Sequence, residues 1–238
     1  MKYLVGIQPT GRIHLGNYLG CIAKGLRLQD QGHEVIFLIA NYHSLTTDNY
    51  TDETEIELKR LGCKTIVKQT PDYTELFFKL CCKLNLATLL KMPQYKDKSE
   101  SSKFDLGLLL YPVLMTADIM INDPDIVIVG RDQVPHLELA NDIAKRYDGR
   151  EFKYEFGDVD KIMSLSDPSK KMSKSLGEKH VIYIFDEDYE KKLKKAVTTP
   201  EGLENLYKIA KSIGINESFE SNLELKVKIA EKLKSIFQ

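Results

Sequence analysis

The chain has 238 residues, of which 42% are hydrophobic and 29% are charged, and its formal net charge at pH 7 is −1. This length allows one sizeable core with at most a small appended domain, and it excludes two full domains. The chain lacks an apolar run of the roughly 18 residues that a membrane span needs, and its charge is unlike that of a protein that binds nucleic acid by charge alone, so we expect a cytoplasmic globular protein without membrane contact.

The cysteines and the charge distribution bear on whether the protein binds a metal or RNA. The four cysteines have neither CxxC spacing nor nearby histidines, so we expect reduced thiols and no zinc or iron–sulfur site. Residues 1–160 carry 19 Lys and Arg against 23 Asp and Glu, whereas residues 161–238 carry 15 against 12. The basic excess therefore lies late in the chain, where a solvated helix face and an RNA contact are both open interpretations.

Apolar runs and helical patterns alternate through the first two thirds of the sequence. Continuous apolar runs, typical of buried parallel strands, occupy residues 3–7, 35–40, 65–68 and 126–129. Helical patterns occupy residues 16–31, 52–61, 72–84, 104–120 and 133–147. The alternation predicts an α/β, Rossmann-like parallel sheet with helices on both faces. Ligands of such sheets bind outside the carboxyl ends of the strands.

The later part of the chain reads differently. Residues 96–103 and 164–177 are polar and without periodicity, which predicts two mobile loops. After the second loop, the pattern predicts a short strand at 181–185 and helices at 187–197, 200–213 and 223–237. We therefore expect the sheet domain to end near residue 185 and a small C-terminal helical region to occupy residues 186–238.

The first apolar run leads into a glycine-containing turn, GIQPTGRIHLGNY, at residues 6–18. Its glycines let the backbone approach a ligand, and a helix N-terminus attracts an anion through its N–H groups and its dipole. His14 and Asn17 are spaced to project toward the same side. The turn is thus a candidate phosphate site. Alternatively, Asn17 is a simple helix cap and His14 is a bystander.

A second phosphate-binding candidate, KKMSKS, lies at residues 170–175. Its lysines, Lys171 and Lys174, can stabilise the charge that develops on the bridging oxygen as pyrophosphate leaves. Either lysine alone would be read as solvated surface charge. Together with the first turn, the pair indicates chemistry at the α-phosphate of a nucleoside triphosphate.

These two motifs resemble the HIGH and KMSKS motifs of class I aminoacyl-tRNA synthetases, and the form GxQPTGxxHLGNYxG is similar to that of the bacterial-type tryptophanyl enzymes. The similarity extends from about residue 2 to residue 197. It implies catalytic roles for His14, Asn17, Lys171 and Lys174, with Mg²⁺ bridging phosphate oxygens. The ATP contacts that it implies are Gln8, Thr10, Gly16, Lys96, Gly130, Asp132, Met163, Met172 and Ser173.

The segment YPVLMTAD at residues 111–118 is the candidate for substrate selection. Its acid, Asp118, ends an apolar helical run and must be paired or hydrogen-bonded if it is buried. A turn cap would explain it structurally, but the segment also resembles the stretch of tryptophanyl enzymes whose aspartate accepts the indole N–H. The resemblance further implies that Met115 and Val129 line the indole slot and that Tyr111 and Gln133 hold the amino group. It also places His43 near the indole.

Two residues depart from the family pattern. Arg131 stands where an acidic residue is common, which changes the charge of the turn at residues 130–133. Leu4 replaces an aromatic residue that packs on the substrate ring, so we expect modestly weaker tryptophan binding.

The resemblance therefore implies a tryptophan–tRNA ligase that activates L-tryptophan with ATP and then esterifies tRNA(Trp). It also implies a homodimer, with apolar side chains near residues 76–90 in the interface. Residues 1–185 would form the catalytic nucleotide-binding domain, including the KMSKS loop, and residues 186–238 a reduced, anticodon-binding-like region. Three alternatives stay open: tyrosyl-type specificity on the same fold, a synthetase-derived binding or regulatory protein that no longer charges tRNA, and a nucleotidyl transferase with another substrate.

Overall fold

The computed structural model describes residues 1–46, 49–90 and 106–238, and the chain divides into two compact units. The first unit comprises Met1–Gly11 and Gly25–Phe156, and the second comprises Arg12–Lys24 and Gly157–Gln238. The segment that carries His14 thus groups with the C-terminal part of the chain. The functional division expected after residue 185 is a different partition, and it stays a prediction.

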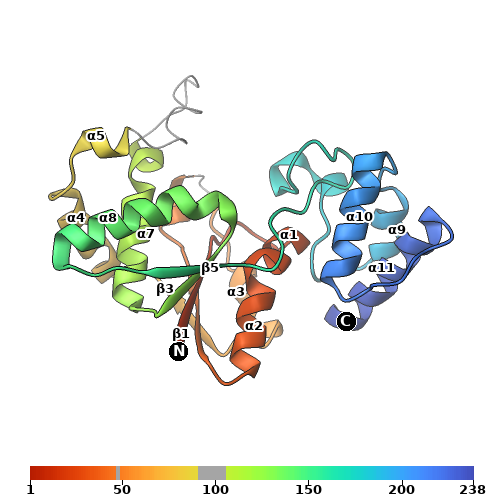
Figure 1. The fold of residues 1–238 in the computed structure, drawn as a ribbon, viewed down its shortest axis with the longest axis horizontal. Helices are drawn as coiled ribbons and strands as arrows, with labels where there is room; N and C mark the ends of the chain where they lie inside the picture. Colours follow the sequence, from red (N-terminus) through yellow and green to blue (C-terminus); the bar gives the residue numbers. More distant parts are fainter. Residues whose placement is uncertain (47–48, 91–105) are drawn as a thin grey trace. The chain divides into compact units, whose positions relative to one another are not determined.

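A five-stranded parallel sheet with the order β3-β2-β1-β4-β5 forms the centre of the first unit (Figure 1). Its strands are β1 (Lys2–Ile7), β2 (Glu34–Ile39), β3 (Thr65–Lys68), β4 (Ile126–Val129) and β5 (Lys153–Phe156). The chain runs outward from β1 to β3 and then returns to the other side of β1. The order therefore reverses between β1 and β4, and in open α/β sheets this switch point is where ligands bind.

Helices cover both faces of this sheet, as predicted. On one face, Leu4 and Leu38 belong to a buried cluster with the helices α4 (Pro71–Cys81), α7 (Leu106–Asn122) and α8 (Val134–Asp148). On the other face lies α2 (Ala23–Asp30), where a Cβ added to Gly25 would be 3.0 Å from both Phe37 and Val5. The glycine is thus what allows α2 to approach the sheet. The unit also contains α3 (Glu53–Arg60) and α5 (Leu86–Leu89).

The second unit is mainly helical. Its longer helices are α9 (Tyr189–Lys194), α10 (Pro200–Ser212) and α11 (Asn222–Phe237), and α11 packs against both others. The buried Lys226 of α11 donates from Nζ to Ala196 O at 2.6 Å, which satisfies a backbone carbonyl just beyond α9. Short elements precede these helices: α1 (Leu15–Asn17), the π-helix η1 (Tyr18–Ile22), and the 3-10 turns η4 (Lys174–Leu176) and η5 (Glu178–His180).

The structure corrects several predicted elements. The single helix expected at residues 16–31 is divided into α1, η1 and α2. The strand expected at 181–185 is wrong: Tyr183 forms only an isolated bridge with His14, because the apolar segment pairs with a turn rather than with a strand. The short strand β5 and the helix α5 were not predicted. None of the helices in the described ranges is long and apolar enough to cross a membrane.

Candidate active site

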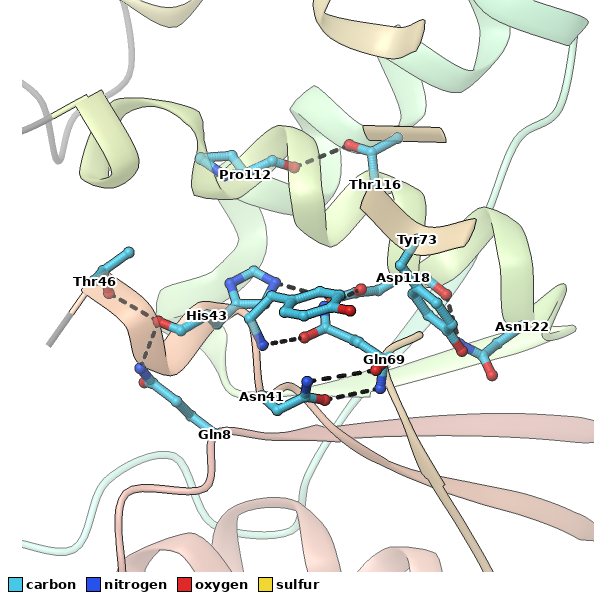
Figure 2. Close-up of polar contacts among 11 residues, drawn as sticks. Gln8, Asn41, His43, Thr46, Gln69, Tyr73, Pro112, Thr116, Asp118 and Asn122 are labelled. Atoms are coloured by element: carbon cyan, nitrogen blue, oxygen red, sulfur yellow. Dashed lines mark hydrogen bonds and ion pairs between the residues drawn. The ribbon is translucent and has the colours of Figure 1, made fainter. Parts of the chain in front are cut away.

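Polar side chains gather where β1, β2 and β3 end (Figure 2). Gln8, directly after β1, donates from Nε2 to the carbonyl of His43 at 3.1 Å, in the turn η2 (His43–Thr46) that follows β2. Gln69 follows directly after β3 and forms two hydrogen bonds with Asn41. The backbone N–H of Gln69 donates to Asn41 Oδ1 at 2.8 Å, and Asn41 Nδ2 donates to the backbone carbonyl of Gln69 at 3.4 Å. These bonds fix the three strand ends relative to one another.

Asp118 of α7 points into this network and is only 4% exposed (Figure 2). Gln69 Nε2 donates to Oδ1 at 2.5 Å, and His43 Nε2 lies 2.9 Å from Oδ2. Asn122 Nδ2 donates to the Asp118 carbonyl at 2.8 Å, within the same helix. A buried carboxylate is costly unless it is hydrogen-bonded. Here the partners come from the ends of β2 and β3, so Asp118 is a fixed acceptor inside the fold and not a cap of the following turn.

A second polar chain joins α7 to the start of α8. The Tyr111 hydroxyl lies 2.7 Å from His136 Nε2, and His136 Nδ1 lies 3.0 Å from Gln133 Oε1. Gln133 Nε2 in turn donates to Asp132 Oδ2 at 3.0 Å. Burial lowers the pKa of His136 to about 4 and raises the pKa of Tyr111 to about 12. Both side chains are therefore neutral near pH 7.

In the turn after β4, the Asp132 side chain lies close to Gly130. A Cβ added to Gly130 would lie 2.6 Å from Asp132 Oδ1, because the aspartate folds back over the turn η3 (Arg131–Gln133). Arg131 stacks on Phe156 of β5, with its guanidinium carbon 4.3 Å from the ring centroid. This cation–π contact directs the guanidinium toward the edge strand. Arg131, which departs from the family pattern, is therefore held by packing on β5.

The apolar candidates lie on the α7 face of the sheet. Leu4 and Val129 are buried in the cluster that α7 covers, and the partly buried Met115 packs against it. The rings of Tyr111 and His43 meet edge to face, with centroids 6.1 Å apart. The structure thus brings all seven predicted tryptophan contacts into the first unit, together with Gln8, Thr10, Gly130 and Asp132.

His14 is the residue that caps the first turn of the second unit. Its Nδ1 accepts the Asn17 N–H at 3.2 Å, whereas the Asn17 side chain is exposed, so the alternative with Asn17 as the cap is wrong. Burial, aided by the charges of Lys174 and Lys171, lowers the pKa of His14 to about 3. A neutral imidazole that accepts at Nδ1 carries its proton on Nε2. His14 can therefore donate a hydrogen bond to a phosphate oxygen without being charged.

Backbone bonds fix the His14 segment to the apolar segment at 181–185. Leu15 N donates to Ile182 O at 2.8 Å, and Ile184 N donates to Ile13 O at 3.0 Å. Arg12 adds a side-chain bond to the carbonyl of Phe185 at 2.8 Å. Segments that are far apart in the sequence are thus joined within the second unit.

The KMSKS segment pairs with residues 162–164. Met172 N donates to Ile162 O and Ser164 N donates to Lys170 O, both at 2.9 Å, and Lys171 forms a bridge opposite Met163. Met172 is buried, whereas Lys171 is exposed, so the methionine anchors the segment while the lysine points outward.

Asn205 of α10 holds the partner segment. Its Oδ1 accepts the Met163 N–H at 2.8 Å and its Nδ2 donates to the Met163 carbonyl at 2.9 Å. Its side chain is buried, and both halves of its amide are engaged with one residue. Because Met163 lies opposite Lys171, α10 contributes to the position of the lysines.

Gly16 and Ser173, two further predicted ATP contacts, are also in the second unit. A Cβ on Gly16 would lie 3.1 Å from the His14 ring, and the hydroxyls of Ser173 and Ser175 are 2.9 Å apart. Lys96 lies outside the described residues. Within the described ranges, no cluster of three or more His, Cys, Asp or Glu could hold a metal ion.

Gln69, His136 and Asn205 are among the residues of these networks that the sequence did not predict. Gln69 follows a strand end, which is the one signal that points to it, since ligands bind at such ends. His136 and Asn205 lie inside helices and outside the motifs, so their polar contacts became apparent only from the fold.

The parallel sheet with its switch point, the His14 turn and the KMSKS segment together indicate the fold of the class I aminoacyl-tRNA synthetases. The chain belongs to the class I tRNA synthetases for tryptophan and tyrosine, whose family model matches residues 1–66 and 64–237. It is similar to the tryptophan–tRNA ligase of Wolinella succinogenes, with 38% identity over 83% of this chain and 68% of the relative. With that of Mycoplasma genitalium it shares 34% identity over 95% of this chain and 77% of the relative.

Solved structures agree with this assignment. The tryptophanyl-tRNA synthetase of Mycoplasma pneumoniae has a TM-score of 0.84 and 29% identity, covering 99% of this chain and 85% of that one. The Campylobacter jejuni enzyme, complexed with ADP and tryptophan, has a TM-score of 0.73 and 28% identity, covering 100% and 86%. The tyrosyl-tRNA synthetase of Aeropyrum pernix has a TM-score of 0.77 at 22% identity, which shows likeness of fold alone.

Proposed function

We propose that this chain activates L-tryptophan with ATP, releasing pyrophosphate, and then transfers the tryptophanyl group to tRNA(Trp). The observation that carries the proposal is the buried carboxylate of Asp118, held by Gln69 and His43 beside an apolar cluster at the strand ends. The relatives named as tryptophan–tRNA ligases support the same substrate.

An apolar slot with one fixed acceptor suits the indole ring, whose single N–H is its only strong donor. A ring without that donor would leave a buried carboxylate short of a partner, and sites of this kind reject such analogues by roughly 10⁴- to 10⁵-fold. Leu4 and Val129 supply the apolar surface, and Met115 adapts to the ring edge.

In the activation step, an oxygen of the tryptophan carboxylate bonds to the α-phosphorus while the bond from that phosphorus to the pyrophosphate oxygen breaks. His14 donates from Nε2 to a phosphate oxygen, and Lys171 and Lys174 stabilise the charge that collects on the leaving group. Asn17, Gly16, Met163, Met172 and Ser173 complete the ATP contacts of the second unit, and Gln8, Thr10, Gly130 and Asp132 those of the first. Mg²⁺, carried by ATP, would neutralise part of the phosphate charge.

We also propose a homodimer formed through α4 and α5. Phe78 is 68% exposed and Leu86 is 57% exposed, which is high for large apolar side chains. We further propose that the reaction takes place in the cytoplasm and that residues 186–238 contact the anticodon of the tRNA.

The test is ATP–pyrophosphate exchange measured with each of the twenty amino acids in turn. Exchange that depends on tryptophan alone is expected, and the double variant Lys171→Ala/Lys174→Ala should abolish it. Exchange with tyrosine but not tryptophan would favour the tyrosyl alternative. Exchange with no amino acid would favour a nucleotidyl transferase or a regulatory protein.

A further inference from the structure

We propose that His136 is a positioning residue that directs acceptor oxygens of Tyr111 and Gln133 toward the substrate's ammonium group. The inference rests on the proposed function, since it concerns how the same site would recognise an amino acid. It starts from the polar chain Tyr111–His136–Gln133–Asp132, in which each side chain contacts the next.

The direction of every bond in this chain follows from its last member. The Asp132 carboxylate can only accept, so Gln133 directs its Nε2–H toward Asp132 and its Oε1 toward His136. Oε1 can only accept, so His136 Nδ1 carries the proton.

Neutral imidazole has one N–H, which leaves Nε2 of His136 as an acceptor. The Tyr111 hydroxyl must then donate its only proton to that nitrogen. Burial keeps the pKa of His136 near 4, and the groups that act on it are Asp132 on η3 and His43 on η2. His136 therefore stays in this form at neutral pH.

A hydroxyl whose only hydrogen is engaged in the hydrogen bond to His136 can bind a further group only as an acceptor. The Gln133 carbonyl likewise only accepts, and Asp132 adds negative charge at the end of the chain. An ammonium group has three donors and no acceptor, so it matches this set, whereas a carboxylate or a neutral ether does not. The fold thus selects for the charged amino group of the substrate.

A purely structural role makes a different prediction. His136 is fully buried, and its ring meets the Tyr111 ring edge to face at 5.1 Å, so its loss could also loosen the packing. Loosened packing would weaken binding of the indole part and of the amino group alike. A ligand without an amino group therefore separates the two roles.

The experiment is calorimetric titration of L-tryptophan and of indole-3-propionate, which lacks the ammonium group, into the wild type, His136→Phe and His136→Gln. The buried neighbour Leu137→Ala, on the same helix, is the packing control. In His136→Phe we expect the Kd for tryptophan to rise about 10- to 150-fold, the size of effect expected when a hydrogen bond to a charged group is lost. The Kd for indole-3-propionate should change less than about threefold.

His136→Gln keeps a polar side chain and should recover part of the tryptophan affinity, which also covers the case in which the phenylalanine variant does not fold. Equal weakening of both ligands, as expected for Leu137→Ala, would overturn the inference, and so would an unchanged Kd for tryptophan. The readout is binding, so a wild type that binds tryptophan without catalysing exchange would contradict the proposed function and still test His136.

Discussion

Asp118 combines burial with two side-chain donors, and this combination fixes the position of its carboxylate. Gln69 and His43 hold one oxygen each, at 2.5 and 2.9 Å. The group is therefore oriented before a substrate arrives, and its preorganisation is what makes a single hydrogen bond selective.

Replacing Asp118 by asparagine should impair tryptophan use far more than ATP use. The variant keeps the shape but removes the charge and brings an N–H toward the indole N–H. We expect the KM for tryptophan to rise about 10- to 150-fold, as for loss of a hydrogen bond to a charged group, with the KM for ATP within about threefold. Pyrophosphate exchange measures both constants. Asp148→Asn, at an exposed ion pair with Arg150, is the control. Equal changes in both constants would argue against an indole contact.

His14 makes stability depend on pH. Its pKa is about 3 in the folded chain and near 6.5 when unfolded, so the unfolded state binds more protons below pH 6.5. The stabilisation is complete above that pH and is lost progressively as the pH falls toward 3. We expect this titration to lower the free energy of unfolding by about 2 kcal/mol when the pH falls from 7 to 5. Urea unfolding of the wild type and of His14→Gln at both pH values should reveal a smaller pH effect in the variant, and an equal effect would contradict the assignment.

The sequence predicts the candidate site residues that lie in motifs, but it does not predict the side chains that hold those residues in place. Asp118 stood out because an acid in an apolar run needs a partner. The identity of that partner, Gln69, depends on which strand ends lie next to α7, and this is a property of the strand order.

At the scale of elements, the helix α10 supports the KMSKS segment through one side chain. Asn205 engages both the N–H and the carbonyl of Met163, and Met163 lies opposite Lys171. A helix from the region expected to contact tRNA thus also holds the segment that lies opposite Lys171, one of the two lysines proposed to bind the triphosphate.

Asn205→Ala should leave two backbone groups of Met163 without their partner, which costs about 1–3 kcal/mol for each buried group. We expect faster hydrogen exchange in residues 162–172 and a fall in kcat for pyrophosphate exchange of about tenfold, with the KM for tryptophan unchanged. The exposed Asn216→Ala is the matched control. Normal kcat with normal hydrogen exchange would rule out this support.

Elements were predicted well where burial dictates the pattern. The strands β1 to β4 are continuous apolar runs, and each was placed within a residue or two. The apolar run at 181–185 looked the same but is buried by pairing with the His14 turn, which periodicity cannot distinguish from a strand. The edge strand β5 alternates charged and aromatic residues over four positions, too short a pattern to be recognised.

At the scale of the whole molecule, all the candidates for tryptophan recognition fall in the first unit, whereas the four catalytic candidates, His14, Asn17, Lys171 and Lys174, fall in the second. The part of the signature turn that carries His14 and the KMSKS segment, although distant in sequence, belong to the same unit. A change at these catalytic candidates should therefore affect ATP use more than tryptophan binding.

The dimer proposed through α4 and α5 can be tested by sedimentation. The wild type should sediment as a dimer at micromolar concentration, and Phe78→Lys/Leu86→Lys should sediment as a monomer, because lysine charges would have to be buried in the interface. Leu223→Lys on α11, which replaces a side chain that is 60% exposed, should remain dimeric. A monomeric wild type would contradict the proposal.

Acylation of a tRNA(Trp) transcript tests activation, amino-acid choice and transfer in one measurement. The chain is incubated with ATP, Mg²⁺ and radiolabelled tryptophan or tyrosine, and acid-precipitable tRNA is counted over time. The account predicts ATP-dependent attachment of tryptophan, no attachment of tyrosine, and loss of the reaction in Lys171→Ala/Lys174→Ala. Attachment of tyrosine, or no attachment of tryptophan under conditions in which a known tryptophanyl-tRNA synthetase charges the same transcript, would contradict it.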